Sequence, residues 1–248
     1  MIILLIEVDP INAFGGSSMR DLYNMANHLY KIKKKDEIRA IYVYHLSIPP
    51  IYRFPPNTIF CKENYKIGFT QIVSKVQSGE TLFCMFSSYK YQTLNETKKS
   101  NTQEQNERRK NKANCNKIFD ELKQILIHNL PETCYFIGLV DTCYSCSMYD
   151  LEMNWNITHW DIINNDDVST CRAISLGAYL DNQFSSCDIN FGGSMTVHLI
   201  DNDLIKCLFS NSHNELRRMY TMLLTIFEDL KQIPSLQANF AYVSHLEK

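Results

Sequence analysis

The stretch CYFIGLVDTCYSCSMYD, residues 134–150, is an apolar run that ends in an aspartate and leads into a cysteine. Residues 134–141 are apolar almost without interruption, which is typical of a strand that is buried on both faces of a sheet. Asp141, Thr142 and Cys143 stand where this strand ends. Because ligands bind at the carboxyl ends of parallel strands, the stretch indicates both a buried sheet and a candidate site.

The rest of the chain alternates strand patterns with helix patterns. Apolar runs predict further strands at 2–7, 39–45, 81–87, 172–180 and 239–243. Apolar residues at three- and four-residue spacing predict helices at 14–32, 64–77, 117–130, from 193 to about 209, and at 212–233. This alternation predicts a three-layer α/β/α sandwich with a largely parallel sheet of about six strands.

Composition limits the class of protein. The chain has 248 residues, 45% of them hydrophobic, and its net charge of −2 gives no reason to expect nucleic acid or a membrane as partner. The opening MIILLIE is too short for a secretory signal, and no apolar run has the length of about 20 residues that spans a membrane. The nine cysteines are therefore expected to be reduced thiols in a cytoplasmic protein.

Residues 95–114 form a polar segment, NETKKSNTQEQNERRKNKAN, almost without large apolar side chains. Such a composition cannot bury enough apolar surface to fold by itself, so we expect a solvated loop.

Cys143 has four interpretations on its residues alone. It is a nucleophile, one half of a redox pair with Cys146, a zinc ligand together with Cys134, Cys171 or Cys187, or a buried and inert thiol. The spacing of these cysteines is irregular for zinc, and the residues after Cys146 form no clear helix of the kind that redox motifs use. A buried thiol is the natural interpretation of three other cysteines, Cys84, Cys134 and Cys207.

Several motifs resemble the metacaspase family of caspase-like cysteine peptidases. LVDTCYSCSMYDL resembles the nucleophile segment D-S-C-H-S-G, and SGETLFCMFSSYK (78–90) resembles G-D-x-L-F-F-x-Y-S-G-H-G. FGGSSMRDLYNM resembles L-x-G-C-x-N-D-x-x-x-M, DNQFSSCDINFGGSMT resembles D-x-Q-T-S-A-D followed by G-A-M-T, and QIPSLQ resembles Q-x-P-Q-L. The matches occur in family order from about residue 2 to 243, which implies a single caspase-like domain over 1–248.

The resemblance assigns catalytic positions, with departures. Cys143 falls on the nucleophile, but Tyr89 stands at the histidine position. The oxyanion-hole region falls on Ser88 and Tyr144, and Ser88 replaces a glycine there. Tyrosine has a pKa near 10 and is a poor base at neutral pH. Three histidines are candidate substitutes for the missing base: His45, His159 and His198.

The resemblance also implies a pocket and a metal site. The family's pocket for an Arg or Lys side chain falls on Asp21, Ser87 and Asp141, where all three residue types are retained. The calcium-binding aspartates that activate many metacaspases fall on Asp150 and Asp120. Calcium needs six to eight oxygen ligands, so two carboxylates are few and we expect no required cofactor.

Two functions follow as hypotheses. The first is a metacaspase-like cysteine endopeptidase homologue, directed at Arg or Lys if active, with Cys143 as nucleophile and a degraded dyad. The alternative is a catalytically inactive pseudopeptidase that acts as a binding or regulatory module. The expected partner is a peptide or protein substrate with Arg or Lys, or a related peptidase.

Overall fold

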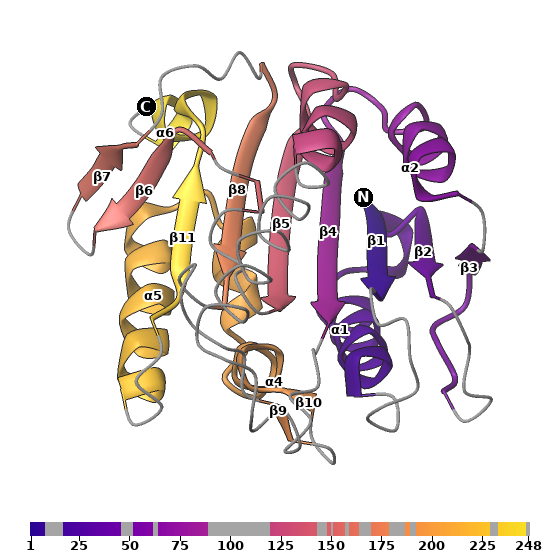
Figure 1. The fold of residues 1–248 in the computed structure, drawn as a ribbon, viewed down its shortest axis with the longest axis horizontal. Coiled ribbons are helices and arrows are strands. Elements are labelled where there is room, and N and C mark those ends of the chain that lie inside the picture. Colours follow the sequence, from indigo (N-terminus) through magenta and orange to yellow (C-terminus); the bar gives the residue numbers. More distant parts are fainter. Residues whose placement is uncertain are drawn as a thin grey trace, which may run out of the picture.

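The protein is built around one large sheet (Figure 1). The computed structural model describes residues 1–7, 17–45, 52–61, 64–88, 120–142, 148–149, 151–156, 159–163, 170–178, 187–188, 192–228 and 233–246. The strands of the large sheet are β1 (Ile2–Glu7), β2 (Ala40–Tyr44), β3 (Thr58–Cys61), β4 (Thr81–Ser88), β5 (Tyr135–Thr142), β6 (Met153–Asn156), β7 (His159–Ile162), β8 (Arg172–Gly177) and β11 (Ser235–Ala238). They lie in the order β3-β2-β1-β4-β5-β8-β11-β6-β7.

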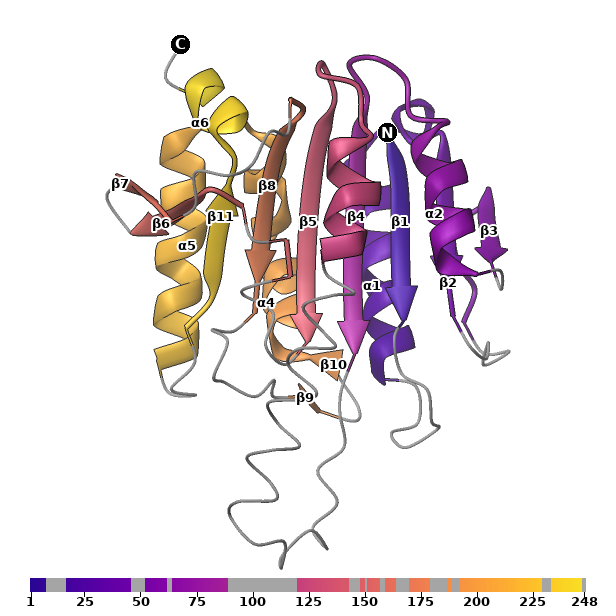
Figure 2. The ribbon, with the colours of Figure 1, turned by 45° about the horizontal axis from the view of Figure 1, so that its top comes forward.

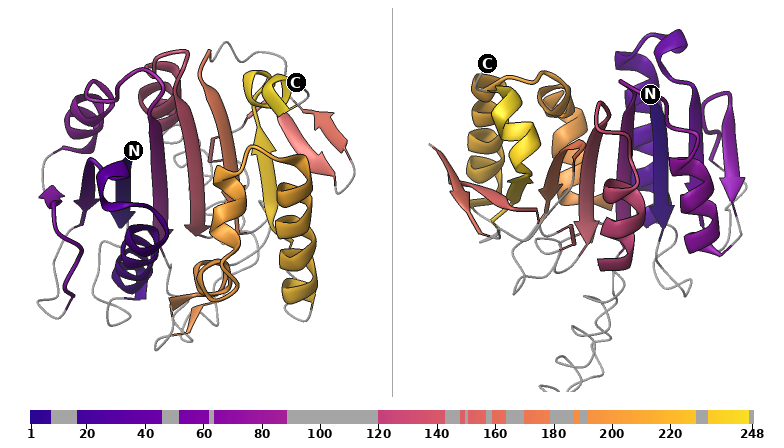
Figure 3. Two further views of the ribbon diagram at one scale, coloured as in Figure 1. Left: turned by 180° about the vertical axis from the view of Figure 1, so that it is seen from behind. Right: turned by 90° about the horizontal axis from the view of Figure 1, so that it is seen from above.

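Helices cover both faces of the sheet (Figure 3). On one face lie α1 (Ser17–Ile32), α4 (Ser194–Asp201) and α5 (His213–Glu228), and on the other α2 (Tyr65–Val73) and the π-helical turn η2 (Gln124–His128). Shorter elements are the 3-10 turns η1 (Lys35–Glu37) and η4 (Leu204–Phe209), the helix α6 (Phe240–Leu246), and the ribbon of β9 (Cys187–Asp188) and β10 (Gly192–Gly193). The two layers of helices agree with the predicted α/β/α sandwich. In the described part of the chain, no helix is long and apolar enough to cross a membrane.

The centre of the sheet is parallel and buried on both faces. β3, β2, β1, β4, β5 and β8 pair in parallel, so their carboxyl ends meet at one edge, which lies at the bottom of Figure 1. Along β1, Ile3 and Leu5 enter the core beneath α1, whereas Ile2 and Leu4 enter the core beneath α2. Burial of both faces explains why these strands are continuously apolar in the sequence.

The predicted number of about six strands was wrong, because nine strands of the described chain form the large sheet. The three additional strands are β3 at one edge and the antiparallel pair β6–β7 at the other. Each has four residues, and in β3 the side chains are partly or fully exposed. Short edge strands of mixed polarity carry no apolar run, so hydrophobic periodicity does not reveal them.

The strand predicted at 239–243 was also wrong. The last strand is β11, which pairs antiparallel with β8 and β6, and α6 follows it. Asn239 separates the two elements, because its Oδ1 accepts hydrogen bonds from the backbone N–H groups of Ala173 at 3.0 Å and Tyr242 at 2.9 Å. The bond to Tyr242, three residues ahead, is the bond of a helix N-cap, so Asn239 starts a helix where the apolar pattern suggested a strand.

The predicted helices are present with altered bounds. α1, α2 and α5 confirm the helices predicted at 14–32, 64–77 and 212–233, in shorter form. The helix predicted from 193 to 209 is divided into α4 and η4, because Asp203 between them has a φ of 55°, outside the right-handed helical region. The helix predicted at 117–130 is described from residue 120 and ends in the π-helical turn η2. The polar segment 95–114 lies outside the described residues.

Candidate active site

Three polar residues form one row at the carboxyl ends of neighbouring strands. Glu7 on β1 is the register partner of Ser87 on β4, and Ser87 is the register partner of Asp141 on β5. Register partners on adjacent strands are about 5 Å apart and project to the same face. Met85 and Leu139, two residues earlier on β4 and β5, lie in the core beneath α1 and α4. The row therefore faces these two helices.

Asp21 on α1 lies against this row. The hydroxyl of Ser87 donates a hydrogen bond to Oδ2 of Asp21 at 2.9 Å, and the backbone N–H of Gly193 donates one to Oδ1 at 2.9 Å. Leu22 and Met25 on the same helix are fully buried, which holds this face of α1 against the sheet. Asp21 and Ser87 are themselves fully buried.

Asp141 is held by the first turn of α4. Its Oδ2 accepts hydrogen bonds from the backbone N–H of Thr196 at 3.0 Å and from the Thr196 hydroxyl at 2.7 Å. Gly193, the N-cap of α4, bonds Asp21, so both carboxylates contact the amino end of one helix. The partial positive charge of a helix amino end favours nearby carboxylates. Figure 2 shows β10, which runs into α4, beside the ends of β4 and β5.

Asp21, Ser87 and Asp141, hereafter the rim cluster, are the three residues that the family resemblance assigned to a pocket. The structure brings them together through one hydrogen bond and one pair of register partners. All three are fully buried. Two carboxylates at one buried location suit a cationic side chain, because buried charges are normally paired.

Ser18, Gly193 and Thr196 adjoin the rim cluster and were not predicted. Ser18 precedes Asp21 by three residues on α1, so the two side chains share a helix face. Ser18 is 1% exposed, and its hydroxyl has no hydrogen-bond partner in the described chain. A serine near a helix start normally indicates a helix cap, so the sequence did not indicate that Ser18 is buried. The segment GGSMT, which contains Gly193 and Thr196, was recognised only as a family motif.

The predicted nucleophile and its partners lie outside the described residues: Cys143, Tyr144 and Tyr89. Their neighbours in the sequence are placed. Thr142, which precedes Cys143, is the register partner of Ser88, which precedes Tyr89. Ser88 thus ends β4 beside the end of β5, while the orientation of its side chain lies outside the description.

All seven histidines of the chain fall within the described residues, so each can be placed relative to these strand ends. His45 follows β2, three strand positions from β5, which corresponds to about 14 Å. Its ring contacts Phe60, with centroids 5.7 Å apart. His198 follows Thr196 by two residues on α4 and so lies on another face of the helix, where its ring packs 5.9 Å from that of Phe227.

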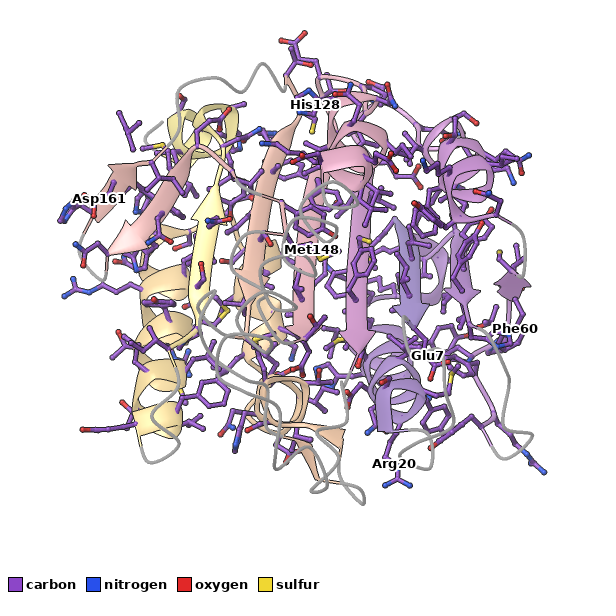
Figure 4. The ribbon with its side chains drawn as sticks, viewed as in Figure 1. Glu7, Arg20, Phe60, His128, Met148 and Asp161 are labelled. Carbon is purple, nitrogen blue, oxygen red and sulfur yellow. The ribbon has the colours of Figure 1, made fainter. Side chains whose placement is uncertain are left out.

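The other histidines lie further away. His28 is seven residues beyond Asp21 on α1, about 10 Å along the helix, and its Nε2 is 3.3 Å from Asp203. His159 is on the edge strand β7, with Nε2 2.8 Å from Asp161 (Figure 4). The remaining three lie at the start of α5 beside β6, in α6 beside the first residue of β5, and at the end of η2 on the opposite edge: His213, His245 and His128. No histidine of the chain therefore lies at the ends of β4 and β5.

Three cysteines are confirmed as buried thiols: Cys84, Cys134 and Cys207. Burial raises the pKa of Cys84 to about 12 and that of Cys207 to about 11, which keeps both protonated at neutral pH. The partners proposed for a redox or zinc role, Cys146 and Cys143, lie outside the described residues. Those interpretations stay predictions.

The two aspartates of the calcium prediction are only partly described. Asp120 is exposed at the start of the helix that leads into η2, and Asp150 lies outside the description. Within the described ranges, no group of three or more His, Cys, Asp or Glu side chains could hold a metal ion. The calcium site therefore stays a prediction.

Comparison with known proteins agrees with this fold. The profile of the metacaspase, peptidase C14 domain family matches residues 4–152, more than half of the chain, and ends where β6 begins. Among solved structures, the crystal structure of protein GSU0716 from Geobacter sulfurreducens is similar, with a TM-score of 0.50 and 13% identity over 96% of this chain and 92% of that chain. That likeness supports the fold alone. No curated protein sequence matches significantly. From the family profile, the chain belongs to the metacaspase, peptidase C14 domain family.

Proposed function

We propose that the rim cluster binds the side chain of an Arg or Lys residue in a peptide or protein, and that the chain hydrolyses such peptides far more slowly than a metacaspase with a catalytic histidine. The observation that carries the proposal is the contrast between the two sides of the site. The carboxylates of Asp21 and Asp141 are gathered at the strand ends, while every histidine lies elsewhere.

The binding half rests on charge and hydrogen-bonding capacity. The carboxylates of Asp21 and Asp141 accept hydrogen bonds from Ser87, Gly193 and Thr196, and an ionised carboxylate is acceptor-only, which suits a cationic donor. Charge-assisted hydrogen bonds to a guanidinium or ammonium are about twice as strong as neutral ones. The partners of such a site are basic peptide segments of substrates or of a related peptidase.

The catalytic half rests on the missing base. A cysteine thiol with a pKa near 8.5 is only a few per cent thiolate at pH 7. A histidine within hydrogen-bond range would take its proton and later protonate the leaving amine. Tyr89, with an ordinary pKa near 10, supplies neither efficiently. Loss of general acid–base catalysis lowers rates by about 10² to 10⁴.

A second candidate is a working cysteine endopeptidase with the same Arg or Lys preference and Cys143 as nucleophile. Its support is the adjacency of Thr142 and Ser88, which brings the strands that lead to Cys143 and Tyr89 side by side. The Tyr89 hydroxyl would then act as a proton donor or stabilise an oxyanion.

Hydrolysis of fluorogenic Arg and Lys peptides separates the two candidates. Wild type, Cys143→Ala and Tyr89→His are compared with and without calcium, with a norleucine peptide as control substrate. We expect little wild-type hydrolysis and a gain of about 10²-fold or more in Tyr89→His. Wild-type hydrolysis that Cys143→Ala abolishes and Tyr89→His does not increase would favour the second candidate.

Peptide binding is measured in parallel. Ser88 and Tyr144 differ from the family's residues in the oxyanion-hole region, and these differences alone could prevent hydrolysis by Tyr89→His. Fluorescence anisotropy with labelled Arg and norleucine peptides reports the pocket directly. Preferential binding of the Arg peptide that Asp141→Asn abolishes supports the binding half. Equal binding of both peptides by wild type would contradict it.

A further inference from the structure

Glu7 adds a third carboxylate beside the rim cluster. It is the last residue of β1 and the register partner of Ser87, so Glu7, Ser87 and Asp141 span three adjacent strands. Figure 4 labels Glu7 at the carboxyl end of β1, near the start of α1. Ile3 and Leu5, which share its alternation along β1, lie in the core beneath α1, so Glu7 belongs to the same face as the rim cluster.

Exposure distinguishes Glu7 from the other two carboxylates. Glu7 is partly exposed, whereas Asp21 and Asp141 are fully buried. Of the three carboxylates, Glu7 is therefore the one that contacts solvent. An ionised carboxylate therefore lies on the solvent side of two buried ones.

The separation of the carboxylates favours one kind of cation. Two strand spacings separate Asp141 from Glu7, about 10 Å between Cα atoms, with Ser87 between them. A guanidinium carries five N–H donors in a planar fork and can bond carboxylates on two sides. An ammonium is a compact charge with three donors.

We infer that Glu7 is a specificity-determining residue that makes this site prefer arginine over lysine, an inference that rests on the proposed function. The guanidinium bridges Glu7 at one end of the row and Asp141 at the other. A lysine ammonium reaches the buried carboxylates and leaves Glu7 uncontacted.

Ser18 is an independent indication that a donor enters this site. Its hydroxyl is buried, shares a helix face with Asp21, and has no hydrogen-bond partner in the described chain. A buried polar group without a hydrogen-bond partner is unfavourable. An N–H group of a bound side chain would supply the missing bond.

The test compares three labelled peptide amides that differ at one position, which is Arg, Lys or norleucine. Dissociation constants are measured by fluorescence anisotropy for wild type, Glu7→Gln, Glu7→Asp and Asp141→Asn, and mass spectrometry verifies that the peptides stay intact. Glu132→Gln is the matched control, because Glu132 is an exposed acid in the turn before β5, at the opposite edge of the sheet. Thermal unfolding verifies that each variant is folded.

We expect wild type to bind the Arg peptide about tenfold more tightly than the Lys peptide, as one charge-assisted hydrogen bond allows. Glu7→Gln removes most of that difference by weakening Arg binding, and Glu7→Asp, with its shorter reach, removes part of it. Glu132→Gln changes neither constant. An unchanged Arg-to-Lys ratio in a folded Glu7→Gln variant overturns the inference, as does an equal loss for both peptides.

Failure of the proposed function gives a different pattern. If wild type binds the Arg and norleucine peptides equally, both the pocket and the role of Glu7 are wrong. Asp141→Asn could abolish the preference for Arg over norleucine while Glu7→Gln leaves the ratio of the Arg and Lys dissociation constants unchanged. That result would support the proposed pocket and contradict the role of Glu7.

Discussion

The hydroxyl of Ser87 at the end of β4 donates a 2.9 Å hydrogen bond to Oδ2 of Asp21 on α1, 66 residues earlier in the chain. Both residues are fully buried, so the bond joins the sheet edge to the helix without competition from water. Gly193 bonds the other oxygen of Asp21 and ties α4 to the same point. The rim cluster is thus a structural junction as well as a candidate pocket.

Replacing Ser87 tests this junction. Ser87→Ala removes the donor to a buried carboxylate, and we expect the free energy of unfolding in urea to fall by about 1 to 3 kcal/mol. Ser74→Ala is the control, because Ser74 is exposed and its hydroxyl bonds only the nearby carbonyl of Gln71. Equal stability of the two variants would show that the Ser87–Asp21 bond contributes little.

Gly138 accommodates the ring of Tyr149, and a larger residue should not fit. A Cβ at Gly138 would lie 2.6 Å from Cε2 of Tyr149 and 3.0 Å from Cε1 of Phe136. Gly138→Ala should destabilise the protein by about 1 to 3 kcal/mol, measured by urea unfolding. Combining it with Tyr149→Leu should cost less than the sum of the single changes, because the smaller side chain relieves the clash. Strict additivity would argue against this contact.

Glu80 should make stability depend on pH below neutrality. Burial alone would raise the pKa of its carboxyl, but hydrogen bonds from Arg39, from the backbone of Gln77 and from the amino group of Met1 lower it to about 2. The folded pKa lies below the unfolded value of about 4.5. The contribution is therefore complete above pH 4.5 and lost as the pH falls toward 2.

Glu80→Gln should accordingly lower the free energy of unfolding at pH 7 by about 1 to 2 kcal/mol, discounted because the Arg39 side chain is partly exposed. Its stability should change less than that of wild type between pH 4.5 and 2.5. Asp36→Asn, at an exposed acid in η1, is the control. A variant with the wild-type pH profile would refute the assignment to Glu80.

His45 should not act as a substitute base. It follows β2, about 14 Å from β5, the strand that leads to Cys143, so we expect no proton transfer between the two residues. Alkylation of Cys143 by iodoacetamide, followed by mass spectrometry across pH 6 to 10, should give the same profile in His45→Gln as in wild type. Tyr89→His should shift the profile to lower pH, as a neighbouring imidazolium stabilises the thiolate. A tenfold slower reaction in His45→Gln would reverse this conclusion.

The buried thiols should resist the same reagent. Burial raises the pKa of Cys84 to about 12, and that of Cys207 to about 11. At pH 8 we expect neither to be alkylated in the folded protein, whereas both should react in urea. Equal labelling of Cys84 with and without urea would mean that its surroundings open readily.

Local hydrophobic patterns in the sequence were sufficient to predict the central strands of the sheet. The runs predicted at 2–7, 81–87 and 134–141 are β1, β4 and β5 to within one residue, because strands that are buried on both faces must be apolar throughout. The spacing of Leu22, Met25 and Leu29 correctly predicted the buried face of α1, because the residues that a helix packs against the sheet must be apolar. Three of the site residues, Asp21, Ser87 and Asp141, were identified from motifs at or near the ends of these elements.

The sequence by itself therefore determined the central strands, the main helices and the residue types of the rim cluster. Only the tertiary structure decided that Gly193, 172 residues from Asp21, bonds the same carboxylate as Ser87, and that Ser18 is buried beside it. It also decided the short edge strands, the helical start at Asn239 and the distance of every histidine from the carboxyl ends of β4 and β5. These features depend on contacts between segments far apart in the chain, and hydrophobic periodicity reports only which residues are buried, not which residues they meet.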